Sequence, residues 1–431
     1  MNTKKIYTVI VTIFTFCYIC NAQSYSDYKL STLEFVAKGE SYTTNTEDLS
    51  NAQNELAIRY YNGSKGATKD IRKAAYWFLQ SAKNGNKYAQ YNIAQRYKKG
   101  DGVKINLKAA LYWFRKSGEQ HFHKASLQAG KMYFYGKGSD VNYENAAKCF
   151  KDAAFGDIPE GKFYYALCYA KGYGVPRDSV KTWIWANRAI NDKYYRIYWV
   201  LGKMYEEGET VTKDYSYARF YYEKGVEHGI AACANSLGLG YENGTLADYS
   251  EKDTNKALEY FQIAAEKGNR LGKANLARLY ANKDLDVYNP QKAELLYKEL
   301  VQSGYEQYDN NLFRIYRETN NKQGIFEINK KWADKGNTLA MNRLAYMYVK
   351  GEGTAPSLEK ALSIINEALE KEPDNLNYLD TKGDVYLIWG EEKKAKSIWK
   401  KIKKINPNFY DKPTDGFSPS DLNAYFVAKS K

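Results

Sequence analysis

Residues 89–118 read AQYNIAQRYKKGDGVKINLKAALYWFRKSG, and this stretch decides the fold. Its first half places a small residue, an aliphatic residue, another small residue and a tyrosine at offsets of 0, 4, 5 and 8, which is one face of a helix. Gly100 and Gly102 follow Tyr97 and supply the positive φ that ends a helix. Asn106 then stands where an N-cap accepts a free backbone N–H before the second apolar run. The stretch predicts two helices joined by a glycine turn.

The same pattern returns along the chain, mostly with a period of 36 residues. The tyrosine at the end of the first helix recurs as Tyr60, Tyr97, Tyr133, Tyr169, Tyr205, Tyr241, Tyr280, Tyr316 and Tyr348. The N-cap of the second helix recurs as Asp70, Asn106, Asn142, Asp178, Asp214, Asp253, Asn289, Asn321 and Ser357. Because the connections are short and the two series agree repeat by repeat, we expect an all-α, right-handed α-solenoid, a superhelix of stacked helix-turn-helix repeats.

The full repeat reads small-x-x-x-Leu-Gly/Ala-x-x-Tyr-x-x-Gly-x-Gly-Val, then Asp or Asn, Lys-Ala, Trp-Tyr/Phe and Ala-x-x-Gly, and it resembles the Sel1-like repeat family. The resemblance covers residues 49–372 in nine units and weakens in the later ones, where Thr210 replaces the second loop glycine. Residues 373–410 resemble one tetratricopeptide repeat, a relative of the Sel1-like unit. Its matching positions are Gly383, Tyr386, Ala395, Trp399, Ile402 and Pro407. The resemblance implies a binding scaffold without a cofactor.

Residues 1–22 have the features of a signal peptide. Lys4 and Lys5 precede an uncharged run, and cleavage is expected near Ala22–Gln23, a junction similar to those of exported bacterial proteins. Removal of this segment changes the formal net charge from +14 to +12 and leaves no transmembrane segment in the mature chain. We therefore expect a periplasmic or secreted protein.

The alternative to cleavage by signal peptidase is a lipid anchor on Cys17 or Cys20. Phe16 and Ile19 are bulkier than the residue that usually precedes a lipidated cysteine, which favours plain export.

Two further segments lie outside the repeats. Residues 23–48 are polar and are interpreted as a linker. Residues 411–431 are interpreted as a tail or capping helix. The alternative is that this tail docks a partner.

The sequence offers little material for catalysis or metal binding. It has 3 histidines, and His121 and His123 would point about 200° apart if both lay on one helix. Phosphate-binding loops and nucleophile elbows are missing, and the mature chain has no Cys-x-x-Cys pair. The three cysteines of the mature chain, Cys149, Cys168 and Cys233, are interpreted as small buried hydrophobic residues. We predict no catalytic residues, no metal site, no cofactor and no enzymatic activity.

The net positive charge of the chain allows two interpretations. Lysines between residues 393 and 404 alternate with apolar residues, so they are interpreted as the solvated face of a helix or as a patch for an anionic partner. Export argues against nucleic acid. Acidic proteins, anionic glycans and lipid head groups of the cell envelope are the remaining candidates.

First helices line the concave side in this class of solenoid, so we expect a partner-binding groove there. The stripe that faces it is predicted to contain Tyr91, Gln95, Lys98, Leu127, Lys131, Phe134, Phe163, Trp199 and Lys203. Rings beside lysines suit an extended peptide with acidic residues, or a sugar chain stacked on aromatic faces. Packing of several of these rings against the next repeat is the alternative.

These observations predict an exported, non-catalytic scaffold or adaptor that mediates protein–protein interaction in the bacterial cell envelope through the concave groove. A glycan- or peptidoglycan-binding protein is the second hypothesis. A hydrolase acting on cell-wall material or β-lactams is the third.

Overall fold

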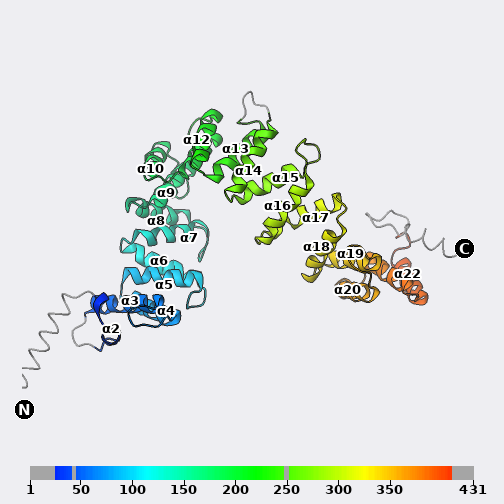
Figure 1. The fold of residues 1–431 in the computed structure, drawn as a ribbon, viewed down its shortest axis with the longest axis horizontal. Helices are drawn as coiled ribbons and strands as arrows, with labels where there is room; N and C mark the ends of the chain where they lie inside the picture. The colour runs from blue at the N-terminus through cyan, green and yellow to red at the C-terminus, as the bar shows by residue number, and fades with distance from the viewer. Residues whose placement is uncertain (1–24, 41–44, 247–251, 410–431) are drawn as a thin grey trace, which may run out of the picture. The chain divides into compact units, whose positions relative to one another are not determined.

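The computed structural model describes residues 25–40, 45–246 and 252–409, and the regular elements in these ranges are all helical (Figure 1). The predicted signal peptide at 1–22 and the predicted tail at 411–431 lie outside these ranges. The chain forms two compact units, residues 1–267 and residues 268–431, and each is described by itself.

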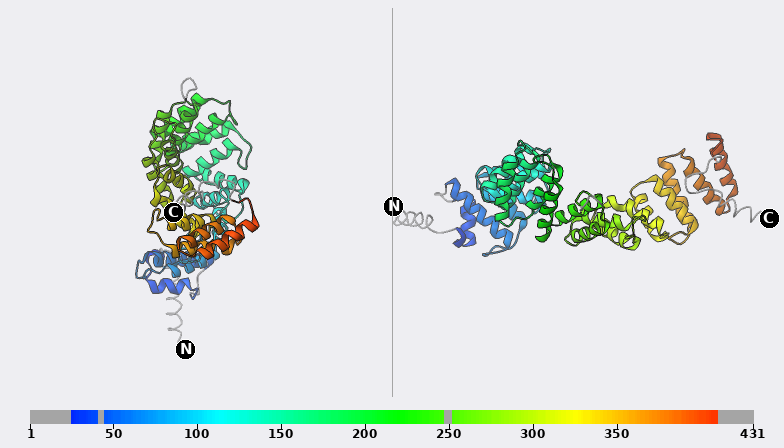
Figure 2. Two further views of the ribbon diagram at one scale, coloured as in Figure 1. Left: turned by 90° about the vertical axis from the view of Figure 1, so that its right-hand side faces the viewer. Right: turned by 90° about the horizontal axis from the view of Figure 1, so that it is seen from above.

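The first unit stacks six helical hairpins, each made of a first helix and a second helix (Figures 1 and 2). The first helices are α3 (Thr46–Asn62), α5 (Lys87–Lys99), α7 (His123–Phe134), α9 (Pro159–Lys171), α11 (Ile197–Glu207) and α13 (Ala231–Asn243). The second helices are α4 (Ile71–Lys83), α6 (Leu107–Glu119), α8 (Tyr143–Phe155), α10 (Ser179–Asn191), α12 (Tyr215–Glu227) and α14 (Thr254–Glu266). Within this unit, each second helix from α4 to α12 packs on the first helix that follows it, so the predicted stacking is confirmed.

The second unit continues the same alternation. Its helices are α15 (Arg270–Tyr280), α16 (Pro290–Gln302), the 3-10 turn η3 (Glu306–Tyr308), α17 (Asp309–Glu318), α18 (Lys322–Asp334), α19 (Thr338–Lys350), α20 (Leu358–Lys371), α21 (Leu376–Ile388) and α22 (Glu392–Ile405). The last hairpin is the segment that resembles a tetratricopeptide repeat. There Gly383 leaves room for the ring of Trp399, because a Cβ at this position would lie 2.5 Å from the indole nitrogen.

The caps and glycines act as predicted. The side chain of Asp70 accepts the backbone N–H of Lys73 at 2.9 Å, and all nine predicted N-caps cap a second helix in this way. The first loop glycine ends the first helix in a left-handed conformation, as at Gly100 with φ +79°.

The second loop glycine has a packing role between repeats. A Cβ on Gly174 would lie 2.1 Å from the carbonyl oxygen of Tyr143, the first residue of α8 in the preceding repeat. Gly102, Gly138 and Gly353 meet the first residue of a preceding second helix in the same way. Thr210 replaces this glycine in the fifth repeat, and its hydroxyl donates instead to the carbonyl of Ala170 at 2.8 Å.

The predicted linker at 23–48 needs correction. Residues Tyr25–Asp27 form the 3-10 turn η1 and Leu30–Ala37 form α2, which packs on α3 with Leu33 fully buried. The buried guanidinium of Arg59 donates to the carbonyls of Tyr28 at 2.7 Å, Tyr25 at 3.0 Å and Ser26 at 3.1 Å. The segment therefore covers the apolar end of the first repeat, which a solenoid has to shield from water.

In three second helices of the first unit, a residue other than glycine occupies the left-handed closing position. Gly85 and Gly229 occupy the closing position in the first and fifth repeats with φ of +93° and +73°. The repeats between them carry His121, Asp157 and Lys193, with φ of +58°, +60° and +60°. These three residues thus adopt the left-handed conformation of the closing glycine, although it costs a residue with a Cβ about 1–2 kcal/mol.

Candidate interaction surface on the first helices

The first helices lie on the inner side of each unit. The main contacts between α-helices that are not consecutive along the chain join the first helices of adjacent hairpins, namely α9 with α11, α11 with α13 and α19 with α21. In a curved stack the elements on the inner side approach each other most closely. The predicted location of the candidate surface therefore agrees with the packing in each unit.

On α5 the predicted stripe is present and polar. Tyr91 is half-buried, with its ring centroid 5.6 Å from that of Phe114 and 5.1 Å from that of Phe122 in edge-to-face arrangements, and its hydroxyl accepts a hydrogen bond from Gln95 at 2.9 Å. The ammonium of Lys98 donates to Gln128 of the next repeat at 3.0 Å. Partial burial lowers the pKa of Lys98, and the neighbouring ammonium groups, Lys131 first among them, act in the same direction.

On α7 the exposed stripe is rotated from the predicted one. Leu127 is only 6% exposed, and Phe134 packs among the surrounding aromatic rings, so neither side chain lines an open groove as predicted. Gln128 and Tyr135 take these places, and the side chain of Tyr135 is 54% exposed. Lys131, which lies between them, pairs with Glu160 at 2.8 Å. The direction of the stripe is shifted by one residue because the core of the next repeat takes the two larger apolar side chains.

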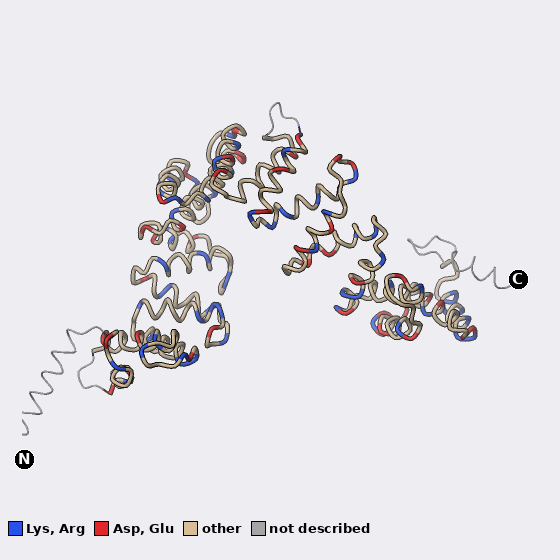
Figure 3. The backbone as a smooth tube through the Cα atoms, viewed as in Figure 1, with Lys and Arg blue, Asp and Glu red and all other residues tan. Residues whose placement is uncertain are grey.

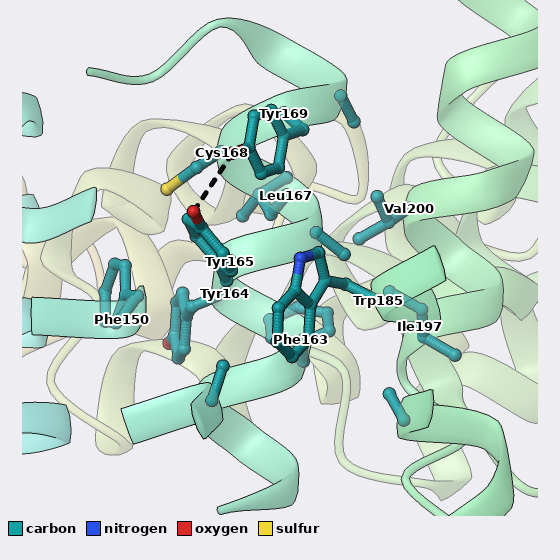
Figure 4. Close-up of a cluster of buried hydrophobic side chains, with 14 of the residues drawn as sticks. Phe150, Phe163, Tyr164, Tyr165, Leu167, Cys168, Tyr169, Trp185, Ile197 and Val200 are labelled. Atoms are coloured by element: carbon teal, nitrogen blue, oxygen red, sulfur yellow. Dashed lines mark hydrogen bonds between the residues drawn. The ribbon is translucent and has the colours of Figure 1, made fainter. Parts of the chain in front are cut away.

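The prediction for α9 is wrong in the same way. Phe163 is 4% exposed and lies in an apolar cluster with Tyr165 and Trp185 (Figure 4). Every residue from Gly161 to Ala170 is buried, because α8, α10 and α11 all pack against this helix. A helix that is apolar on all sides is a core element. The inner side of the fourth repeat is therefore filled.

On α11 the predicted residues are placed differently. Trp199 is half-buried and packs on the same apolar cluster as Phe163. Lys203 pairs with Glu206 at 2.6 Å, and Glu206 also accepts the hydroxyl hydrogen of Tyr222 at 2.6 Å. The lysine charge is thus neutralised within its own repeat.

The remaining accessible groups form one contiguous patch, which we call the inner surface. It consists of Lys98, Gln128, Lys131, Tyr135, Lys137 and Glu160, contributed by α5, α7, the loop after α7 and α9. Its hydrogen bonds run from repeat to repeat, and the hydroxyl of Tyr135 lies 3.2 Å from that of Tyr164. The patch contains three lysines and one glutamate, so it carries a net positive charge. Over each unit as a whole, acidic and basic residues are mixed (Figure 3).

Sequence reasoning missed Gln128, Tyr135, Lys137 and Glu160. Gln128 and Tyr135 each follow a predicted stripe residue, so the helical period alone could not separate them from Leu127 and Phe134. Lys137 lies in the turn, and Glu160 belongs to the next repeat. Only contacts between repeats bring these two side chains to the patch.

The other candidate groups do not form a reactive site. His121 lies in the turn before α7, not on the helix, and the Nδ1 atoms of His121 and His123 lie 3.8 Å and 3.1 Å from the carboxylate of Asp152. Ser126 also donates to Asp152, at 2.6 Å, so its hydroxyl faces a carboxylate and not an imidazole. Within the described ranges no group of three His, Cys, Asp or Glu residues is arranged to hold a metal ion.

The three cysteines in the described ranges are free thiols. Cys168 and Cys233 are buried and Cys149 is half-buried. Burial raises the pKa of the Cys149 and Cys168 thiols to about 12, and it raises that of Cys233 as well. A thiol held in its neutral form is a poor nucleophile.

None of the helices described is long and apolar enough to cross a membrane.

The Sel1 repeat family matches more than half of the sequence. The matched residues are 50–86, 87–122, 123–154, 159–194, 198–230, 231–269 and 338–370. The chain belongs to the Sel1 repeat family. Proteins built from Sel1 and tetratricopeptide-like repeats generally act as scaffolds for protein–protein interaction. The two hairpins between residues 270 and 337 keep the helical arrangement although the family pattern does not match there.

Solved structures of the family resemble this chain. A protective antigen of uropathogenic Escherichia coli with an SLR fold is 25% identical, with coverage of 89% of this chain and 88% of that one and a TM-score of 0.36. A Sel1 repeat protein from Oxalobacter formigenes is 21% identical, with coverage of 70% and 91% and a TM-score of 0.49. The comparison with curated proteins gave no significant match.

Proposed function

We propose that this Sel1 repeat protein is an exported, non-catalytic scaffold of the bacterial cell envelope that binds an acidic, extended segment of a protein partner on its inner surface. The observation that carries the proposal is the set of lysines around Lys98. Its ammonium is partly buried, its neighbours Lys131 and Lys137 are also cations, and only Glu160 opposes them. A partner carboxylate would reduce this repulsion.

The shape of the patch supports a protein partner. Hydrogen-bonding groups repeat along α5, α7 and α9, while the aromatic rings predicted to stack on sugars are largely turned into the core. The exposed ring of Tyr135 remains as an apolar contact beside the lysines. Contact residues of this kind, an aromatic side chain with charges around it, are common at protein interfaces.

Export is part of the proposal and is supported by the composition of residues 1–22. Cell fractionation and the intact mass of the purified protein test it. We expect the protein in the envelope or the medium with a mass that lacks residues 1–22. Full-length protein confined to the cytoplasm would contradict export without affecting the scaffold proposal.

Affinity capture from cross-linked envelope extract tests the binding surface. The variant carries Lys98→Gln and Lys137→Gln. Its matched control carries Lys148→Gln, which removes a lysine from α8 that pairs with Glu144 at 2.8 Å. We expect the unmodified protein and the control to recover the same partner, and the double variant to lose about tenfold in recovery. Equal recovery by all three would contradict the proposed surface, and recovery of wall polymer alone would favour the glycan hypothesis.

A further inference from the structure

An open cavity of about 640 Å³ lies in the second unit, well away from the inner surface in sequence. It is formed by α17, by the end of α18 and by the start of α19. Its lining residues are Asn310, Trp332, Lys335, Gly336, Asn337, Leu339 and Arg343. A volume in this range admits a few residues of a peptide. The lining combines an indole ring, an exposed leucine and polar groups.

Arg343 is the charged residue that points to a ligand. Its guanidinium lies 5.6 Å from the ring centroid of Phe313, and burial lowers its pKa, with the charge of Arg317 adding to the effect. In the described part of the chain neither arginine has a carboxylate within ion-pair distance. Lys335, by contrast, pairs with Glu306.

Comparison with equivalent positions in other repeats shows that this pair of arginines is unusual. Arg317 directly follows the anchoring Tyr316, and Arg343 stands three residues after the small residue Ala340. The same two positions in the second and third repeats hold Lys98 and Gln128, which form a donor–acceptor pair at 3.0 Å. Two arginines at this register cannot pair with each other.

Two guanidinium groups whose charges act on each other favour an anion beside them. A guanidinium binds a carboxylate through two parallel hydrogen bonds, and partial burial strengthens the interaction. The start of α19 adds to this preference, because the first turn of a helix attracts negative charge. The rings of Trp332 and Phe313 lie 5.2 Å apart and offer an apolar wall.

We propose that this cavity binds a carboxylate flanked by an apolar side chain in an extended peptide, with Arg343 holding the carboxylate, the charge of Arg317 adding to the attraction, and Trp332 and Leu339 contacting the apolar group. The inference extends the proposed function, since the ligand is again a protein segment. It uses different repeats, however, and adds a second binding site. The carboxylate can come from an acidic side chain or from a free C-terminus.

Fluorescence anisotropy with labelled octapeptides on the whole protein tests the proposal. One peptide pool has a central glutamate between random apolar residues, and its partner pool has glutamine there; both have amidated ends. A third pool has the glutamine and a free C-terminus. We expect the glutamate pool or the free-end pool to bind at least about tenfold more tightly than the amidated glutamine pool, because charge-assisted hydrogen bonds are worth about 1.5–3 kcal/mol.

The variant Arg343→Gln should abolish this preference and Arg317→Gln should reduce it, with circular dichroism showing unchanged helicity. Arg314→Gln is the matched control, since Arg314 lies on α17 like Arg317 but neither lines the cavity nor contributes to the pKa shift of Arg343. Equal binding of all pools, an unchanged preference in Arg343→Gln, or an equal loss in Arg314→Gln would overturn the proposal. A peptide of residues 411–431 that outcompetes every pool would identify the chain's own C-terminal segment as the ligand and overturn a separate partner.

The inner-surface proposal and the cavity proposal can be tested independently. The Lys98→Gln, Lys137→Gln variant should keep the peptide preference, and Arg343→Gln should keep capture through the inner surface. Loss of peptide preference in the lysine variant would show that the cavity is not an independent site and would contradict the inference. Persistent capture with no peptide binding would leave the scaffold proposal in place and reject the cavity as a site.

Discussion

The backbone N–H of Asp70 donates to the carbonyl of Tyr60 at 2.8 Å, which joins the N-cap of α4 to the last tyrosine of α3. The same bond recurs in all nine Sel1-like units, between each N-cap and its tyrosine, at 2.8 to 3.1 Å. The two residues are ten positions apart in the first repeat, twelve between Tyr241 and Asp253, and five between Tyr316 and Asn321. The bond therefore defines the hairpin more strictly than the loop length does.

The packing role of the second loop glycine predicts unequal effects for two glycine-to-alanine substitutions. Gly174→Ala and Gly229→Ala both place alanine at positive φ, but only Gly174 faces a backbone carbonyl, while a Cβ on Gly229 meets no atom within 4 Å. We expect Gly229→Ala to lower the free energy of unfolding by about 1 kcal/mol and Gly174→Ala by about 1–3 kcal/mol more. Urea denaturation measures both, and equal losses would contradict the packing role.

Glycine at the closing position of α10 should stabilise the protein. Lys193 is exposed and held at φ +60°, so Lys193→Gly removes the left-handed strain. We expect a gain of about 1 kcal/mol after the entropic cost of glycine. Asp157→Gly relieves the same strain but removes the pair with Lys162 at 2.7 Å, and should gain less. A loss of stability in Lys193→Gly, seen in the urea midpoint, would refute this account.

Arg59 should hold the N-terminal segment in place. Arg59→Met leaves Glu55 and three carbonyls without their donor, and we expect it to cost about 3 kcal/mol and to expose residues 25–37 to hydrogen exchange and proteolysis. Arg115→Met is the control. Its pair with Glu119 has the same i, i+4 spacing, but both side chains are about half exposed, so little change is expected. Equal protection of residues 25–37 in both variants would contradict the role of Arg59.

Asp384 predicts a pH dependence of stability. Burial, with the charge of Asp380 added, raises the pKa of Asp384 to about 8, although Lys350 acts in the opposite direction. Between about pH 4 and pH 8 the folded protein therefore binds more protons at this site than the unfolded chain, so this contribution to stability falls as the pH rises. Asp384→Asn should be less sensitive to pH in this range and more stable at pH 8. Parallel stability curves for the two proteins would exclude this role.

The sequence predicted the hairpins because caps and glycine turns are local signals. It misplaced part of the candidate surface because burial depends on the next repeat. Leu127 and Phe163 stand at positions that the helical period assigns to the stripe, but the neighbouring helices cover them. The helix at Leu30–Ala37 was missed because eight residues with three polar side chains show little periodicity on their own, and its stability comes from contacts with α3.

The most direct test of the central claim compares two exposed tyrosines. Tyr135 borders the inner surface and is 54% exposed, and Tyr112 lies on the second helix α6 and is 46% exposed. A photo-cross-linking amino acid placed at either position reports which side touches a partner in living cells. We expect a discrete protein adduct from position 135 and none from position 112. An adduct from position 112 alone, or from neither position, would contradict binding through the inner surface.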